Sequence, residues 1–177
     1  MRRSRKSSIH RAKLRPYGNL ELVDEVIEWS GKVKGESRVL GQAYLYKALI
    51  LASQSELDQA LEIMTNSVDL MIRYSGANSF SSLTTQMYQA ELLTERDTAE
   101  AQRILDSIRA AVEESGSQLV NQRFGLSELL VKHMAGNPVP ADGASVDFAL
   151  CRSNLGLDHA LQRLIRLGVV VPPEHPI

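Results

Sequence analysis

The 177 residues of this chain are enough for one domain with a short appendage. Hydrophobic residues make up 44% of the sequence and aromatic residues only 5%, so Leu, Ala, Ile, Val and Met must fill the core, which favours helices over strands. No apolar run approaches the roughly 20 residues that span a membrane, and the start lacks the apolar segment of a secretory signal. The single cysteine, Cys151, excludes an internal disulfide bond. Together these features predict a protein of the reducing cytoplasm.

Charge is distributed unevenly along the chain. The formal net charge is −1, yet residues 1–18 carry seven basic side chains and no acidic one, which leaves 13 basic and 21 acidic residues in the rest. The basic residues of this arm are Arg2, Arg3, Arg5, Lys6, Arg11, Lys13 and Arg15. We expect a solvated, flexible arm, and two alternatives stay open: an arm that binds nucleic-acid phosphates and an organelle-targeting segment.

A first helix is predicted over residues 20–33, where Asn19 can cap its amino end. Its apolar residues follow two neighbouring stripes with helical spacing. One stripe holds Leu20, Val23 and Ile27, and the other holds Leu22, Val26, Trp29 and Val33. The helix is therefore expected to bury part of its circumference against the next one.

Two helices with a short break between them are predicted over residues 37–76. Leu45, Ala48, Leu49 and Ala52 share one helix face. In the polar break that follows, Ser55 and Asp58 have the spacing of a capping box, so we expect Ser55 to cap the second helix. That helix carries the strongest apolar stripe of the chain, made of Leu57, Ala60, Leu61, Met64, Val68, Met71 and Ile72, and Gly76 is suited to end it.

The same pattern returns over residues 80–116. The first helix of this pair is marked by Leu83, Met87, Ala90 and Leu93. Asp97 and Glu100 repeat the capping spacing, and the second stripe holds Ala101, Ile104, Leu105, Ile108 and Val112. A shift of 40 residues superimposes the second helices of the two pairs, including Gly76 on Gly116. A single pair cannot bury its own apolar stripes, so the repeat predicts stacked helical hairpins.

The remaining sequence predicts a third helix and a C-terminal segment. A helix starts after Ser117 and stops at Gly136, and its apolar residues are Leu119, Leu126, Leu129 and Leu130. A short helix is expected over residues 146–150, followed by another whose apolar residues are Leu157, Ala160, Leu161, Leu164 and Ile165, and then by an extended tail. The predicted division is a basic arm over 1–18, a helical-repeat domain over 19–135, a linker over 136–145, and a capping helix with its tail over 146–177.

Residues 37–135 resemble tetratricopeptide-like repeats. The resemblance rests on the hairpin pattern, on the recurring Ser-Gly ends, and on small residues at Ala48, Ala60, Ala90 and Ala101. The spacing of about 40 residues is most similar to the helical repeats of bacterial signal-responsive transcription activators. This resemblance implies an all-α solenoid of antiparallel helical hairpins that binds proteins or peptides on its concave face, with no catalysis. The residues that it places on that face are Gln42, Tyr46, Lys47, Gln86, Gln89, Asn121 and Arg123.

No catalytic, cofactor or metal motif is recognisable in the sequence. The four histidines, at positions 10, 133, 159 and 175, have no close ligand spacing to one another or to Cys151. We expect Cys151 to be a buried, inert thiol and His159 to lie near a helix end. Charged residues are expected on solvated faces, and Trp29 and the tyrosines are expected to pack between helices rather than to stack on nucleic-acid bases.

Three functions are compatible with these patterns. The favoured one is a non-catalytic scaffold for a protein or peptide partner, and a role in transcriptional regulation or signalling is compatible with it. The alternative is a nucleic-acid-associated or ribonucleoprotein subunit that docks through the basic arm. An enzyme is the third, and it requires a pocket with converging titratable groups. Because so few hairpins leave outer apolar stripes, the ends must be covered by the flanking helices or by a homodimer.

Overall fold

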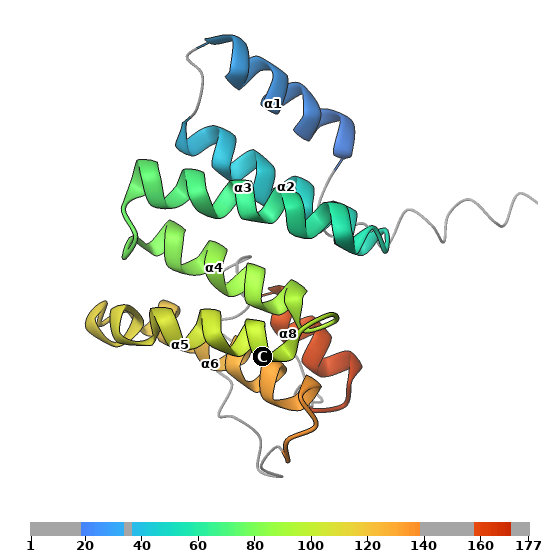
Figure 1. The fold of residues 1–177 in the computed structure, drawn as a ribbon, viewed down its shortest axis with the longest axis vertical. Helices are drawn as coiled ribbons and strands as arrows, with labels where there is room; N and C mark the ends of the chain where they lie inside the picture. Colours follow the sequence, from blue (N-terminus) through green and yellow to red (C-terminus); the bar gives the residue numbers. More distant parts are fainter. Residues whose placement is uncertain (1–18, 34–36, 139–157, 171–177) are drawn as a thin grey trace, which may run out of the picture.

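Helices are the only regular elements in the described part of the computed structural model, residues 19–33, 37–138 and 158–170. The all-α prediction is confirmed for these residues. The helices are α1 (Leu20–Val33), α2 (Arg38–Ser53), α3 (Leu57–Ser75), α4 (Phe80–Leu93), α5 (Thr98–Glu114), α6 (Gln118–Met134) and α8 (Asp158–Arg166). Figure 1 shows them stacked along the long axis of the molecule, with α1 at one end and α6 and α8 at the other.

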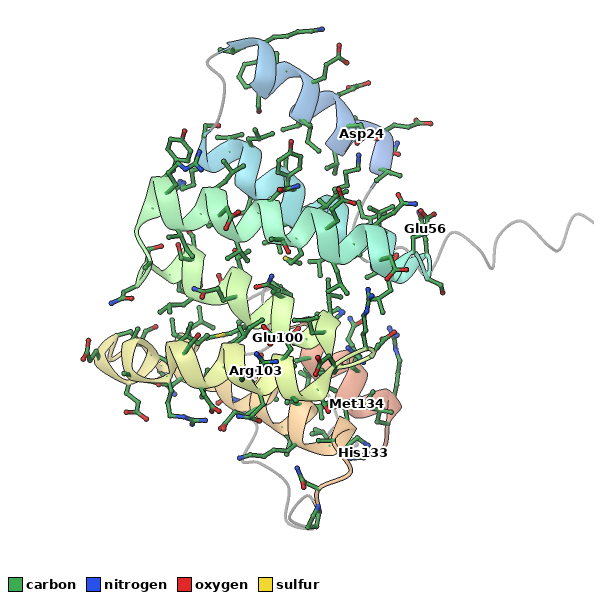
Figure 2. All side chains as sticks on the ribbon, in the orientation of Figure 1. Asp24, Glu56, Glu100, Arg103, His133 and Met134 are labelled. Carbon is green, nitrogen blue, oxygen red and sulfur yellow. The ribbon has the colours of Figure 1, made fainter. Side chains whose placement is uncertain are left out.

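Each helix from α1 to α6 packs on the next one along the chain, and α6 also packs on α4 and on α8. The core is correspondingly divided into three clusters. One lies among α2, α3 and α4 around Met64, a second among α4, α5 and α6 around Leu105, and a third joins α6 to α8 around Leu130. Side chains fill the spaces between the helices, as Figure 2 shows.

Polar caps define where the helices begin. The hydroxyl groups of Ser37, Ser79 and Ser117 accept hydrogen bonds from backbone amides in the first turns of α2, α4 and α6. The predicted cap at Asp97 is confirmed, since its carboxylate accepts from the Glu100 amide at 2.9 Å. The predicted cap at Ser55 is wrong.

Ser55 does not cap α3 because its backbone lies in the left-handed region, with a φ of 67°. The chain turns one residue later than the capping box requires, so Glu56 precedes α3 without a side-chain cap (Figure 2). Asp58 is used elsewhere: its carboxylate accepts a hydrogen bond of 2.6 Å from Arg96, in the turn after α4.

A close approach at Gly41 allows α2 and α3 to pack tightly. A Cβ atom at this position would lie 3.1 Å from the Cβ atom of Leu70 on α3. The Ser67 hydroxyl on α3 donates a hydrogen bond of 2.7 Å to the Gly41 carbonyl oxygen. The absence of a side chain at Gly41 thus brings the two backbones within hydrogen-bonding reach.

The two apolar stripes of α1 have different environments. Leu20, Val23 and Ile27 are half-buried toward the rest of the molecule. The neighbouring stripe stays open, with Leu22, Val26, Trp29 and Val33 between 40% and 60% exposed. The expectation that Trp29 packs between helices is therefore wrong, because α1 has a neighbour on only one side among the described residues.

Several predicted features lie outside the described residues. These are the basic arm over 1–18, Cys151, the short helix over 146–150, most of the predicted linker over 136–145, and the tail beyond residue 170. Within the described part, the C-terminal segment is seen as α8 and as Val170, which is buried against α6.

Candidate functional site

A groove of about 620 Å³ lies between α1 and α2 and reaches the start of α4. Its lining comes from residues spaced by three or four positions, so each helix contributes one face. The lining residues are Asn19, Leu22, Val23 and Val26 of α1, Arg38, Val39, Gln42, Ala43 and Tyr46 of α2, and Ser81 of α4. The lining residues of α1 and those of α2 form two facing stripes, and the trough between them is about 10 Å long, the length of two helical turns.

The groove has a mostly apolar lining that includes a few polar side chains. Leu22, Val39 and Tyr46 are exposed by 59%, 53% and 47% respectively. Arg38 is one of the lining residues and has no ion-pair partner anywhere in the described ranges. The other nearby cation, Lys47, is already paired with Asp24 on α1 at 2.7 Å, and Figure 2 labels Asp24 on that helix.

The open residue Tyr46 has a counterpart in α4. Tyr46 is the ninth residue after the cap Ser37, and Tyr88 is the ninth residue after the cap Ser79. Tyr88 is only 7% exposed. The guanidinium carbon of Arg123 lies 3.7 Å from its ring centroid, and the His159 ring meets it edge-on at 6.1 Å. Tyr88 also belongs to the core cluster formed with α2 and α3, so it is covered by several helices, whereas Tyr46, at the same distance from its cap, faces the groove.

A buried carboxylate, Glu91 of α4, connects three helices near Tyr88. Glu91 is fully buried. Its Oε1 atom accepts hydrogen bonds from Arg123 at 3.0 Å and from Ser127 at 2.6 Å, both on α6. Its Oε2 atom faces the Nδ1 atom of His159 on α8 at 2.7 Å. Because an ionised carboxylate can only accept, Nδ1 is the donor.

Helix α8 also binds the backbone of the same residue. Arg163, one turn after His159, donates a hydrogen bond of 2.7 Å to the carbonyl oxygen of Glu91 and lies 3.2 Å from Glu95. The carbonyl groups at the end of α4 carry partial negative charge, which favours a cation here. His159 and Arg163 therefore hold one residue of α4 from two sides.

Opposing effects determine the charge of Glu91. Burial raises the pKa of this carboxyl group, but the positive charge of Arg123 and the hydrogen bonds from His159 and Ser127 lower it more. The net result is a pKa below the usual 4.5. Glu91 is accordingly an anion at neutral pH, as the surrounding donors require.

Arg123 is incompletely satisfied. It is 2% exposed, and its Nε and Nη1 atoms have no hydrogen-bond partner. The face of the Tyr88 ring supplies a cation–π contact instead. Two buried donors without acceptors cost free energy, on the order of 1–3 kcal/mol each, so this network is less stable than its ion pairs alone suggest.

The residues predicted for the binding face are distributed over several environments. Gln42 and Tyr46 line the groove together. Gln86 donates within its own helix, Gln89 donates weakly to Thr65 of α3, and Asn121 is exposed on α6. The expectation that Arg123 lies on an open face is wrong, because it is buried against Tyr88 and Glu91.

Sequence reasoning missed the Glu91 network and the contribution of α1 to the groove. Glu91 directly follows the small core residue Ala90, so helical spacing alone could have placed a carboxylate next to the core. His159 was expected near a helix end, which is correct, but its partner lies 68 residues earlier in the chain. Such a long-range pairing leaves no local signal in a single sequence.

Among the described residues, no group of three or more His, Cys, Asp or Glu side chains is arranged to hold a metal ion. In the same ranges, every helix is too short or too polar to cross a membrane. No family model matches the chain, and no curated protein or solved structure is significantly similar to it.

Proposed function

We propose that this chain is a protein-interaction module whose groove between α1 and α2 receives an amphipathic helix of a partner protein. The observation that carries the proposal is the pairing of two apolar helix stripes in an open trough. A helix laid in such a trough would contact both walls with residues at its own i, i+3, i+4 and i+7 positions.

The internal arrangement of the chain supports a helix as the occupant. In the proposed stack, α2 with α3 and α4 with α5 are successive tetratricopeptide-like hairpins, and Tyr46 and Tyr88 are equivalent residues. At Tyr88 this chain covers the position with side chains from two helices, α6 and α8. In this arrangement the apolar surface around Tyr46 is open to solvent, whereas helices cover the corresponding surface around Tyr88. A helix is therefore the element expected to bury the surface around Tyr46.

The positive charge of Arg38 in the lining specifies the occupant further. Arg38 has no carboxylate partner among the described residues, whereas Lys47 is neutralised by Asp24. A helix that places Asp or Glu beside Arg38 gains a charge-assisted hydrogen bond. The partner segment is therefore an amphipathic helix with an apolar stripe of about two turns and a carboxylate at one end of it.

Selection from a displayed library of 16-residue helical peptides, with the full chain as bait, tests this proposal. Selected peptides should share an apolar i, i+4, i+7 stripe and an acidic residue beside it. Tyr46→Asp should weaken their binding at least tenfold, because it places a carboxylate in the apolar lining of the groove. Arg38→Glu should select peptides with Lys or Arg in place of the acidic residue.

Tyr74→Asp is a matched control, since Tyr74 is 46% exposed but does not line the groove. It should leave peptide binding unchanged. If Tyr46→Asp and Tyr74→Asp bind the selected peptides equally well, the groove is not the binding site and the proposal fails.

A further inference from the structure

We propose that the surface of α4 and α6 beneath α8 is a second helix-binding site. Helix α8 of the same chain occupies this site and can dissociate from it. The site combines an apolar patch with a carboxylate that binds basic side chains. The patch is made of Leu126, Leu129 and Leu130 of α6, and the carboxylate belongs to Glu91.

Helix α8 contacts the site through a short apolar side and through two basic side chains, as a bound peptide helix would. Its apolar side is short, with Ala160, Leu161 and Leu164 buried on α6. One turn apart on the polar side, His159 binds the Glu91 carboxylate and Arg163 binds the Glu91 carbonyl oxygen. The recognised pattern is thus His, Ala, Leu, one position outside these contacts (Gln162), Arg and Leu, from residue 159 to residue 164.

The α4–α6 contact does not depend on α8. The Oε1 atom of Glu91 is satisfied by Arg123 and Ser127 of α6, and only Oε2 is bound by α8. The Glu91 carbonyl oxygen also has a second donor, the Thr94 hydroxyl at 2.7 Å. When α8 leaves, Glu91 keeps its counter-ion on α6, and water can replace the two donors from α8.

Helix α8 is also too short to persist alone. It has nine residues, fewer than an isolated helix needs in water, so its structure depends on docking. Within the described residues, α6 is the helix that supplies most of its packing, with Tyr88 and Glu91 of α4 and Glu95 of the following turn adding ring and polar contacts. Docking and folding of α8 are therefore coupled, and its release is a local opening that leaves α2 to α6 in place.

A peptide supplied in trans tests this inference. The probe is a fluorescent peptide with the sequence of residues 158–170, and the receptor is the full chain carrying Leu164→Glu, which disrupts docking of the resident α8. The variant should bind the peptide at least tenfold more tightly than the wild-type chain, whose site is occupied. A peptide with His159→Ala and Arg163→Ala should bind the variant at least tenfold more weakly. Equal binding to both chains, or no binding to a variant that keeps the helix content of α1 to α6, would overturn the inference.

Hydrogen exchange of the wild-type chain gives a second test that does not depend on the Leu164→Glu variant. Amides of α8 should exchange faster than those of α5, and Glu91→Gln should accelerate them at least tenfold relative to the α5 amides. Exchange of α8 only together with α5 would show that it does not open separately. Light scattering should give a single copy for the wild-type chain. A stable dimer that Leu164→Glu dissociates would assign the α8 contact to a second copy and overturn the cis arrangement.

Discussion

Tyr46 and Tyr88 each stand nine residues after a serine that caps their helix, yet Tyr46 is 47% exposed and Tyr88 only 7%. The difference comes from their neighbours and not from the local sequence. Arg123 of α6 and His159 of α8 cover Tyr88, whereas Tyr46 faces the groove between α1 and α2. This contrast between a covered and an open tyrosine at the same distance from a helix cap is the basis for the proposal that the groove binds a helix.

The Glu91–Arg123 pair should be critical for stability. Replacing Glu91 by Gln leaves the Arg123 charge buried without a counter-ion, and loss of one member of a buried pair costs about 3–5 kcal/mol. Urea unfolding followed by circular dichroism measures the change. Asp58→Asn is the control, because its pair with Arg96 is largely exposed and contributes little. Equal destabilisation by the two substitutions would contradict the role assigned to Glu91.

Stability should fall in acid through Glu91. Its pKa in the folded chain is below the usual 4.5, so its ionised form stabilises the fold at pH values above 4.5. That contribution is lost as the pH falls below 4.5 toward the folded-state pKa. Other carboxyl groups titrate in the same range, so the measurement is the difference between the wild-type chain and Glu91→Gln. The difference should shrink steadily as the pH is lowered, and a constant difference would contradict the prediction.

Two helical glycines should respond differently to replacement by alanine. Gly125 in α6 has open space where a Cβ atom would stand, so Gly125→Ala should stabilise the chain by about 0.5–1 kcal/mol through helix propensity. At Gly41, the same gain is opposed by the Leu70 Cβ atom at 3.1 Å and by the backbone approach there. Thermal unfolding should rank Gly125→Ala above the wild type and Gly41→Ala below Gly125→Ala. The reverse order would contradict the packing of α2 on α3.

Trp29 should contribute less to stability than its size suggests. A buried tryptophan replaced by alanine costs about 3–5 kcal/mol, but Trp29 is 60% exposed. Trp29→Ala should therefore change the free energy of unfolding by less than about 0.5 kcal/mol, as for other surface sites. Ile27→Ala, on the half-buried stripe of α1, should cost more. A larger effect at Trp29 would mean that its ring is covered in solution.

The helices could be predicted from the sequence because their signals are local. The stripe that includes Met64 and Val68 marks α3 by its spacing, and Asp97 caps α5 three residues before Glu100, as expected. Ser55 has the same spacing to Asp58, but the turn puts Ser55 at a positive φ, and a side-chain pattern does not report backbone conformation.

The arrangement of the site was less predictable, because it depends on contacts between distant residues. The tetratricopeptide-like resemblance named Gln42 and Tyr46 as candidates for a binding face, and both line the groove. That they bind a partner stays a prediction. Arg123 has the same polar character and equally regular spacing. Its burial follows from Glu91 and Tyr88, which lie 32 and 35 residues earlier in the sequence, and no periodicity within α6 reveals them.

The central claim is that the groove between α1 and α2 binds an amphipathic helix. Its most direct test is to add a selected helical peptide to the isotopically labelled chain and to follow the methyl resonances by NMR. The largest shifts should fall on Leu22, Val26 and Val39, with Leu105 in the core unchanged. Shifts centred on the α4–α6 surface, with those three methyl groups unaffected, would contradict the claim.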